Sequence, residues 1–251
     1  MIRKNAERIP GSENENEKEV DFMYFYDSTY ILVLIGVVLC MLASAKVNST
    51  FSRYSHVRSG SGMTGREAAE RILHICGITD VRVEHISGNL TDHYDPSAKV
   101  LRLSDSTYQS TSVAAIGVAA HECGHAVQHH KGYVPLTIRS KLVPAANFGA
   151  KICWPMIIFG VIAGYYQPLI TLGIVLFSLS VLFQLVTLPV EFNASSRALK
   201  ILEQNYLLGH DETSQARKVL SAAALTYVAS AASAILQLLR LVILFGGRRD
   251  D

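Results

Sequence analysis

Three stretches of the chain contain no charged residue and are dominated by apolar side chains. They run from Ser28 to Ala45, from Ile152 to Val190 and from Val219 to Leu239. An uncharged apolar stretch of about 20 residues is long enough to cross a bilayer as a helix. The pattern therefore predicts an integral membrane protein whose helices contact the lipid bilayer.

The middle stretch is too long for one membrane helix, and its interior contains Tyr165, Tyr166 and Pro168. Tyrosine is typical of the membrane interface, and proline is typical of a tight turn. We therefore expect a helical hairpin over 146–190, between a first span over 23–47 and a fourth over 219–247. The first stretch begins too far into the chain for a simple signal peptide, so a retained anchor is expected.

The remaining segments are polar. Residues 1–22 are acidic and lack periodicity, which predicts a disordered tail. Residues 48–145 predict a small α+β domain between the first and second spans. Its expected elements are a helix that begins with the capping-box spacing of Thr64 and Glu67, strands at 81–84 and 100–104 joined through a turn at 92–96, and a helix from about Thr111 to Lys131. Residues 191–218 form a second polar segment of helical composition. The predicted fold class is thus mainly α, with about four transmembrane helices.

The last helix of the predicted domain contains His121-Glu122-Cys123-Gly124-His125, which fits the H-E-x-x-H pattern of zinc peptidases. Residues four apart lie on one helix face, so both imidazoles can reach a single Zn²⁺, with Glu122 positioned as the general base for a metal-bound water. Zinc is favoured because it lowers the pKa of bound water to about 7. A five-residue pattern also arises by chance, so a third ligand is needed to decide the question.

Glu191 is the best candidate for the third ligand. It is the first charged residue after the long apolar stretch, and four spans place its segment on the same side of the membrane as the helix of His121. A solvated carboxylate at a helix end is the alternative. His129 is rejected because three ligands along one straight helix cannot converge on a tetrahedral centre. The metzincin pattern is excluded because it requires histidine where Lys131 stands. We therefore expect one zinc ion per chain, with water in the fourth position.

Three segments together resemble the YugP-type membrane zinc metallopeptidases. They are 90–96 (LTDHYDP), 121–128 (HECGHAVQ) and 188–197 (LPVEFNASSR), and the likeness extends from about residue 23 to residue 245. The resemblance implies a neutral zinc peptidase with a gluzincin-like third ligand, which maps onto Glu191, and a zincin-like domain around the HECGH helix. HtpX-type proteases are more distantly similar and carry aspartate where this chain has Ser195. The hydroxyl of Ser195 could orient a ligand histidine, although less strongly than a carboxylate.

A transition-state donor is also expected opposite the zinc. Arg197, Tyr206 and His210 follow Glu191 and are the candidates from sequence, although each is more often structural.

These features predict a membrane-embedded zinc-dependent endopeptidase that hydrolyses peptide bonds by a zinc-activated water. The substrate class is polypeptide, membrane proteins included, held along an exposed edge strand for which 100–104 is the expected candidate. One alternative is an intramembrane metalloprotease, because 113–120 is apolar, but the helix continues directly into polar residues at 128–131. The other alternative is a zinc-binding membrane scaffold or holdase without catalysis. Such a protein would not need Glu122 as a general base.

Charge distribution bears on location and partners. The formal net charge of +2 comes from scattered basic residues, so nucleic acid is not an expected partner. Basic residues near span ends favour the cytoplasm, which predicts a bacterial-type plasma membrane protein with a cytoplasmic zinc site and both termini outside. The basic residues near span ends on the side of the zinc site are Lys46, Arg53, Arg58, Arg139, Lys141, Lys151, Arg197, Lys200, Arg217 and Lys218. Those on the other side of the membrane are Lys18, Arg240, Arg248 and Arg249. The sequence leaves the oligomeric state open.

Overall fold

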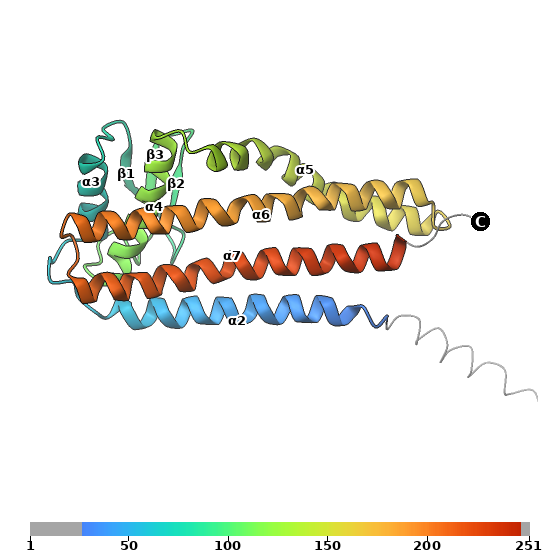
Figure 1. Ribbon diagram of the computed structural model, residues 1–251, viewed down its shortest axis with the longest axis horizontal. Helices are drawn as coiled ribbons and strands as arrows, with labels where there is room; N and C mark the ends of the chain where they lie inside the picture. The colour runs from blue at the N-terminus through green and yellow to red at the C-terminus, as the bar shows by residue number, and fades with distance from the viewer. Residues whose placement is uncertain (1–26, 247–251) are drawn as a thin grey trace, which may run out of the picture.

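The computed structural model describes residues 27–246, which form an elongated molecule (Figure 1). The predicted acidic tail and the first residues of the predicted first span lie outside this range. The elements in chain order are α2 (Tyr30–Ser55), α3 (Gly65–Ile75), β1 (Arg82–His85), β2 (His93–Asp95), β3 (Val100–Leu103), α4 (Val113–His130), α5 (Val134–Ile162), α6 (Gln167–Gln204) and α7 (His210–Phe245).

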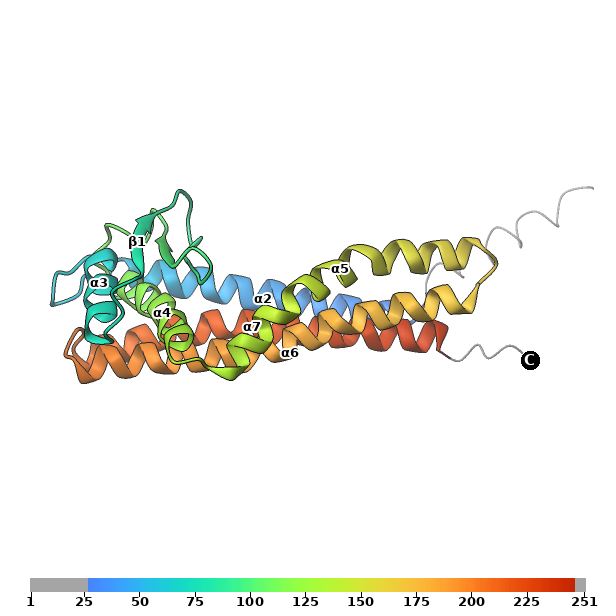
Figure 2. The same cartoon turned by 90° about the horizontal axis from the view of Figure 1, so that it is seen from above.

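Four of the helices, α2, α5, α6 and α7, are long and apolar enough to cross a membrane. This result supports the expected integral membrane protein and gives four candidate spans among residues 27–246. The four helices run lengthwise, with α7 packed against α2 and α6, and α6 packed against α5 (Figures 1 and 2). The helix α4 is not among the candidate spans of residues 27–246, which gives no support to an intramembrane peptidase.

The hairpin turn lies where the sequence predicts it. The helix α5 ends at Ile162 and α6 begins at Gln167, with Pro168 in its first turn, where proline is tolerated. Gly164 and Tyr165 between the helices have φ angles of 78° and 62°. The helices themselves are longer than the apolar stretches, because α5 begins already at Val134 and α6 and α7 continue into the predicted polar segment.

The small sheet differs from the prediction in two respects. Residues 93–95 form β2 rather than a turn, and the strand order is β1-β3-β2. The turn lies one step later, where the side chain of Asp95 accepts hydrogen bonds from the backbone N–H groups of Ser97 and Ala98, and Lys99 has φ 51°. The strand β3 is parallel to β1 and antiparallel to β2, so it is central. The prediction that 100–104 is the exposed edge strand is therefore wrong, and β2 is an edge.

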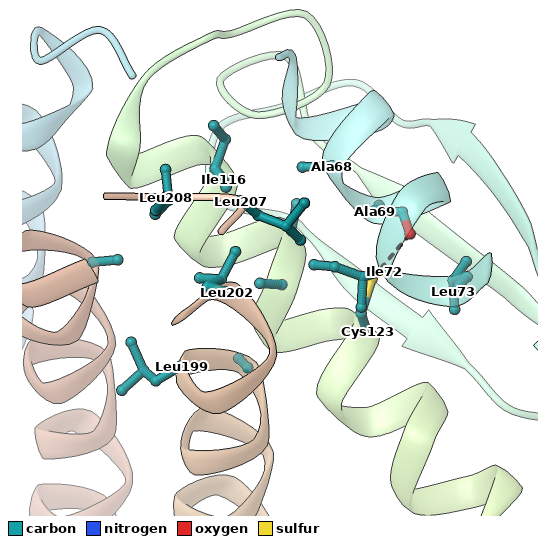
Figure 3. Packing of buried hydrophobic residues seen from close by; sticks show 14 of the residues in the cluster. Ala68, Ala69, Ile72, Leu73, Ile116, Cys123, Leu199, Leu202, Leu207 and Leu208 are labelled. Carbon is teal, nitrogen blue, oxygen red and sulfur yellow. Dashed lines mark hydrogen bonds between the residues drawn. The ribbon is translucent and has the colours of Figure 1, made fainter. Parts of the chain in front are cut away.

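The main hydrophobic core joins the α+β segment to the ends of two membrane helices (Figure 3). The helix α3 begins with the predicted capping box of Thr64 and Glu67 and packs its apolar face against α4. The end of α6 and the loop that follows it fill the space beside these two helices. The labelled members of this core are Ala68, Ala69, Ile72, Leu73, Ile116, Cys123, Leu199, Leu202, Leu207 and Leu208. Residues 191–218 therefore pack as part of the same core as α3 and α4.

Candidate metal centre

The H-E-x-x-H residues lie on α4, which is buried along most of its length. Its first turn is fixed by Ser112, whose hydroxyl accepts a hydrogen bond from the backbone N–H of Ala115 at 3.1 Å. Cys123 faces the core, where its thiol lies 3.6 Å from the carbonyl oxygen of Ala69 and burial raises its pKa well above the usual value. This cysteine is therefore a packing residue, and the opposite face of the rigid helix carries the two histidines.

The side chains of His121, His125 and Glu191 converge, with their ligand atoms all within 4.8 Å of one another. Oε2 of Glu191 lies 3.3 Å from Nε2 of His121 and 3.5 Å from Nε2 of His125. This oxygen is buried and accepts no hydrogen bond within the described part of the chain. Buried polar atoms normally have a partner, so an oxygen that faces two imidazole nitrogens in this way suits a metal ligand. Two imidazoles and one carboxylate are also the donor set of many catalytic zinc sites.

Electrostatics at this point favour a cation. Burial alone lowers the pKa of His125, but the contact with Glu191 and the charge of Glu122 outweigh burial and hold the pKa above the usual histidine value. The two buried carboxylates of Glu122 and Glu191 thus place negative charge beside His125.

Gln128, which the sequence analysis did not single out, sets the tautomer of His125. Its amide nitrogen donates to the carbonyl oxygen of Val190 at 2.8 Å and to Oδ1 of Asn193 at 3.0 Å. Its amide oxygen lies 3.0 Å from Nδ1 of His125. Because that oxygen only accepts, Nδ1 carries the proton and the lone pair of Nε2 faces Glu191. The spacing of Gln128 three residues after His125 was the available signal for this role.

Ser195 lies beside the other histidine. Its hydroxyl oxygen is 3.0 Å from Nδ1 of His121, a position in which it can accept a hydrogen bond from the Nδ1–H group and leave the lone pair of Nε2 for a metal. Ser195 of α6 thus contacts the ring of His121, and Gln128 of α4 contacts the ring of His125.

Close contact between α4 and α6 at Gly124 allows this convergence. A Cβ atom at Gly124 would lie 2.5 Å from the carbonyl oxygen of Ala194. We expect Gly124→Ala to push the helices apart, at a cost of about 1–3 kcal/mol, and to lower the zinc content measured on the purified protein.

Gly117→Ala is the matched control for that measurement. A Cβ atom there would lie 3.3 Å from Cβ of Ala216, so a small adjustment accommodates it, and alanine is the better helix former. Equal zinc contents in the two variants would contradict the importance of the α4–α6 contact.

A cavity of about 280 Å³ opens beside the cluster. Glu122, His125 and Glu191 line it together with two residues that the sequence analysis missed, Arg139 of α5 and Tyr227 of α7. Nη1 of Arg139 lies 3.3 Å from Oε1 of Glu191, so it forms an ion pair with the oxygen that does not face the histidines. Neither residue follows a local motif, because each reaches the cavity from a different membrane helix.

The three sequence candidates for a transition-state donor do not line this cavity. Arg197 donates through Nε to Oδ1 of Asn193 at 2.7 Å, so it supports the Gln128 network. His210 is an exposed residue at the start of α7, and Tyr206 is 91% exposed in the preceding loop. The structure thus brings together His121, Glu122, His125, Glu191 and Ser195 and leaves Tyr206 and His210 outside.

Comparison with known proteins gives two matches. The model of a family described as "Putative neutral zinc metallopeptidase" matches residues 29–246. The chain is also 48% identical over 220 residues to the "Putative membrane protease YugP" of Bacillus subtilis (strain 168), an alignment that covers 88% of this chain and 97% of that protein. No solved structure matches the chain significantly.

Proposed function

Since the chain belongs to the neutral zinc metallopeptidase family, we propose that it is a membrane-embedded endopeptidase with one zinc ion held by His121, His125 and Glu191. The observation that carries this proposal is the convergence of these three side chains at the edge of a cavity that Glu122 lines together with His125 and Glu191. A site that served structure alone would normally fill all four coordination positions with protein ligands. Three protein ligands next to a potential base favour catalysis over a scaffold role.

The reaction divides its chemistry between the ion and the protein. When bound, the zinc ion would act as a Lewis acid that polarises the scissile carbonyl and makes the attacking water more acidic. Glu122 accepts a proton from the attacking water on its carboxylate while the water oxygen bonds to the carbonyl carbon. Glu122 then delivers this proton to the nitrogen of the leaving amine as the C–N bond breaks. The carboxylate returns to its starting state, so the cycle balances without another reactant.

Arg139 and Tyr227 replace the donors expected from the sequence. Both line the cavity beside Glu122, and both carry N–H or O–H groups that could stabilise the negative charge that develops on the carbonyl oxygen. Arg197 and His210 do not line the cavity, so they are not placed to donate a hydrogen bond to this carbonyl oxygen.

The substrate would be a polypeptide in extended conformation. Residues His93 and Tyr94 of β2 line the cavity, and β2 pairs only with β3 among the described strands, so one edge of β2 can pair with a substrate strand. In this proposal the zincin-like unit comprises 48–145 together with 191–218, which share one core.

Metal removal tests the proposal directly. We expect the purified protein, assayed with a defined unfolded membrane-protein substrate, to lose cleavage on dialysis against a zinc chelator and to regain it with one equivalent of Zn²⁺ per chain. Product mapping by mass spectrometry separates this activity from that of a contaminating peptidase. Cleavage that persists in fully metal-free protein would contradict the proposal.

We propose further that the metal centre faces the cytoplasm of a bacterial-type plasma membrane. The basic residues at the span ends on the side of α4 support this orientation. In a background without the native cysteines, an impermeant maleimide added to intact cells is expected to label a cysteine at Tyr166 and to leave one at Lys131 unlabelled. Both positions are exposed, so accessibility differs only through the membrane. The reverse labelling pattern would overturn the orientation.

A further inference from the structure

A second cavity, separate from the metal centre, lies between α2 and α7. Its volume is about 590 Å³, within the range of small-molecule sites. Four basic side chains line it: Lys46 and Arg53 of α2, and Arg217 and Lys218 of α7. No aspartate or glutamate lines the cavity, in contrast to the metal centre. The cavity therefore favours an anionic ligand.

These four cations are available for a ligand. They are exposed, and none of them has an ion-pair partner among residues 27–246. The rest of the lining is partly apolar, through Tyr54, Ala222 and Leu225. A ligand that fits this cavity combines negative charge with hydrocarbon.

The position of the cavity along the helices identifies the ligand class. Lys46 is the first charged residue after the uncharged stretch of α2, and Lys218 is the last one before the uncharged stretch of α7. The two helices pack side by side (Figure 1), so the cavity lies where both change from apolar to charged. That boundary corresponds to the level of lipid headgroups, and α2 exposes large apolar residues such as Met41 and Leu42 just beyond it.

We propose that this cavity binds one anionic phospholipid, with its phosphate group at the four cations and its acyl chains along the apolar surface of α2 and α7. Basic pockets between membrane helices are known to accept anionic headgroups. A cavity of this volume is also larger than an inorganic phosphate ion needs, which favours the lipid over the free anion.

The test uses the full chain in neutral detergent, titrated with phosphatidylglycerol or phosphatidylcholine and analysed by native mass spectrometry. One saturable phosphatidylglycerol adduct, preferred over phosphatidylcholine, is expected. The double variant Arg53→Gln/Arg217→Gln should bind phosphatidylglycerol roughly thirtyfold more weakly. The matched control Lys141→Gln/Lys151→Gln removes the same charge from exposed positions on α5 and should bind like the parent.

A second variant keeps the charges and blocks the space. Leu225→Trp fills the apolar part of the cavity and should also weaken the adduct, which keeps the proposal testable if the double variant does not fold. Equal losses in the two double variants, or equal binding of both lipids, would overturn the proposal. Displacement of phosphatidylglycerol by inorganic phosphate would assign the site to a soluble anion instead. A lipid-free dimer that Leu225→Trp dissociates would assign the surface to a second copy of the chain.

Discussion

Replacing Glu122 with glutamine is expected to abolish peptide hydrolysis while zinc content and fold stay close to those of the parent chain. The side chain is 8% exposed and lines the metal-centre cavity, so the isosteric amide fits the same space. Glutamine cannot take a proton from water, and loss of general-base catalysis costs about 10² to 10⁴ in rate. The measurement is kcat on the defined substrate, together with the zinc content of the same preparation.

Glu203→Gln is the control for this experiment. Glu203 is an exposed carboxylate on α6, outside the cavity, and its replacement makes the same chemical change. It should retain full activity. If Glu122→Gln cleaved at more than about a tenth of the parent rate, Glu122 would not be the base. A zinc-binding scaffold would keep both its metal and its biological function in the Glu122→Gln variant, which separates that alternative from the peptidase.

The membrane architecture was predictable because its signal is local. Uncharged stretches and the interruption near Pro168 gave the number of spans and the hairpin turn, and the spacing of Thr64 and Glu67 gave the start of α3. Helix ends were less well predicted, because polar residues at 191–204 and 210–218 continue the membrane helices without a change of secondary structure. The strand β2 was missed because Asp95 and Pro96 are typical turn residues, and only the pairing with β3 makes 93–95 extended.

The candidate site shows the same division between local and long-range information. His121 and His125 follow from helix periodicity. Glu191 follows from topology, because an arrangement of four spans places its segment on the same side of the membrane as the helix of His121. Arg139 and Tyr227 had no such signal, because their approach depends on how α5 and α7 pack around α6. The cavity proposed to bind a phospholipid likewise depends on the alignment of α2 and α7, which are more than 150 residues apart in sequence.

The second large effect is expected at Glu191, where glutamine should greatly weaken zinc binding and thereby remove activity. Glutamine keeps the shape of the side chain, and its amide oxygen can still accept from Arg139, which lies 3.3 Å from Oε1 of Glu191. The amide nitrogen would replace Oε2, the atom that faces both histidines, and a nitrogen that only donates cannot bind a cation. Glu191→Ala would remove the ligand and also leave Arg139 without its ion-pair partner, so glutamine is the more informative change.

Ser195→Ala provides the scale for this loss. Ser195 contacts His121 through Nδ1 and would not bind the metal, so its removal should lower zinc affinity by about 10- to 100-fold. Glu191→Gln removes a ligand and should lower the affinity further than that. Zinc affinity would be measured by competition with a chromophoric chelator, and zinc-dependent stabilisation against heat would provide an independent readout, because a ligand that binds only the folded state raises the melting temperature. A Glu191→Gln protein with parent-like zinc affinity and activity would show that the third ligand lies elsewhere, and a loss no greater than that of Ser195→Ala would place Glu191 in a supporting role.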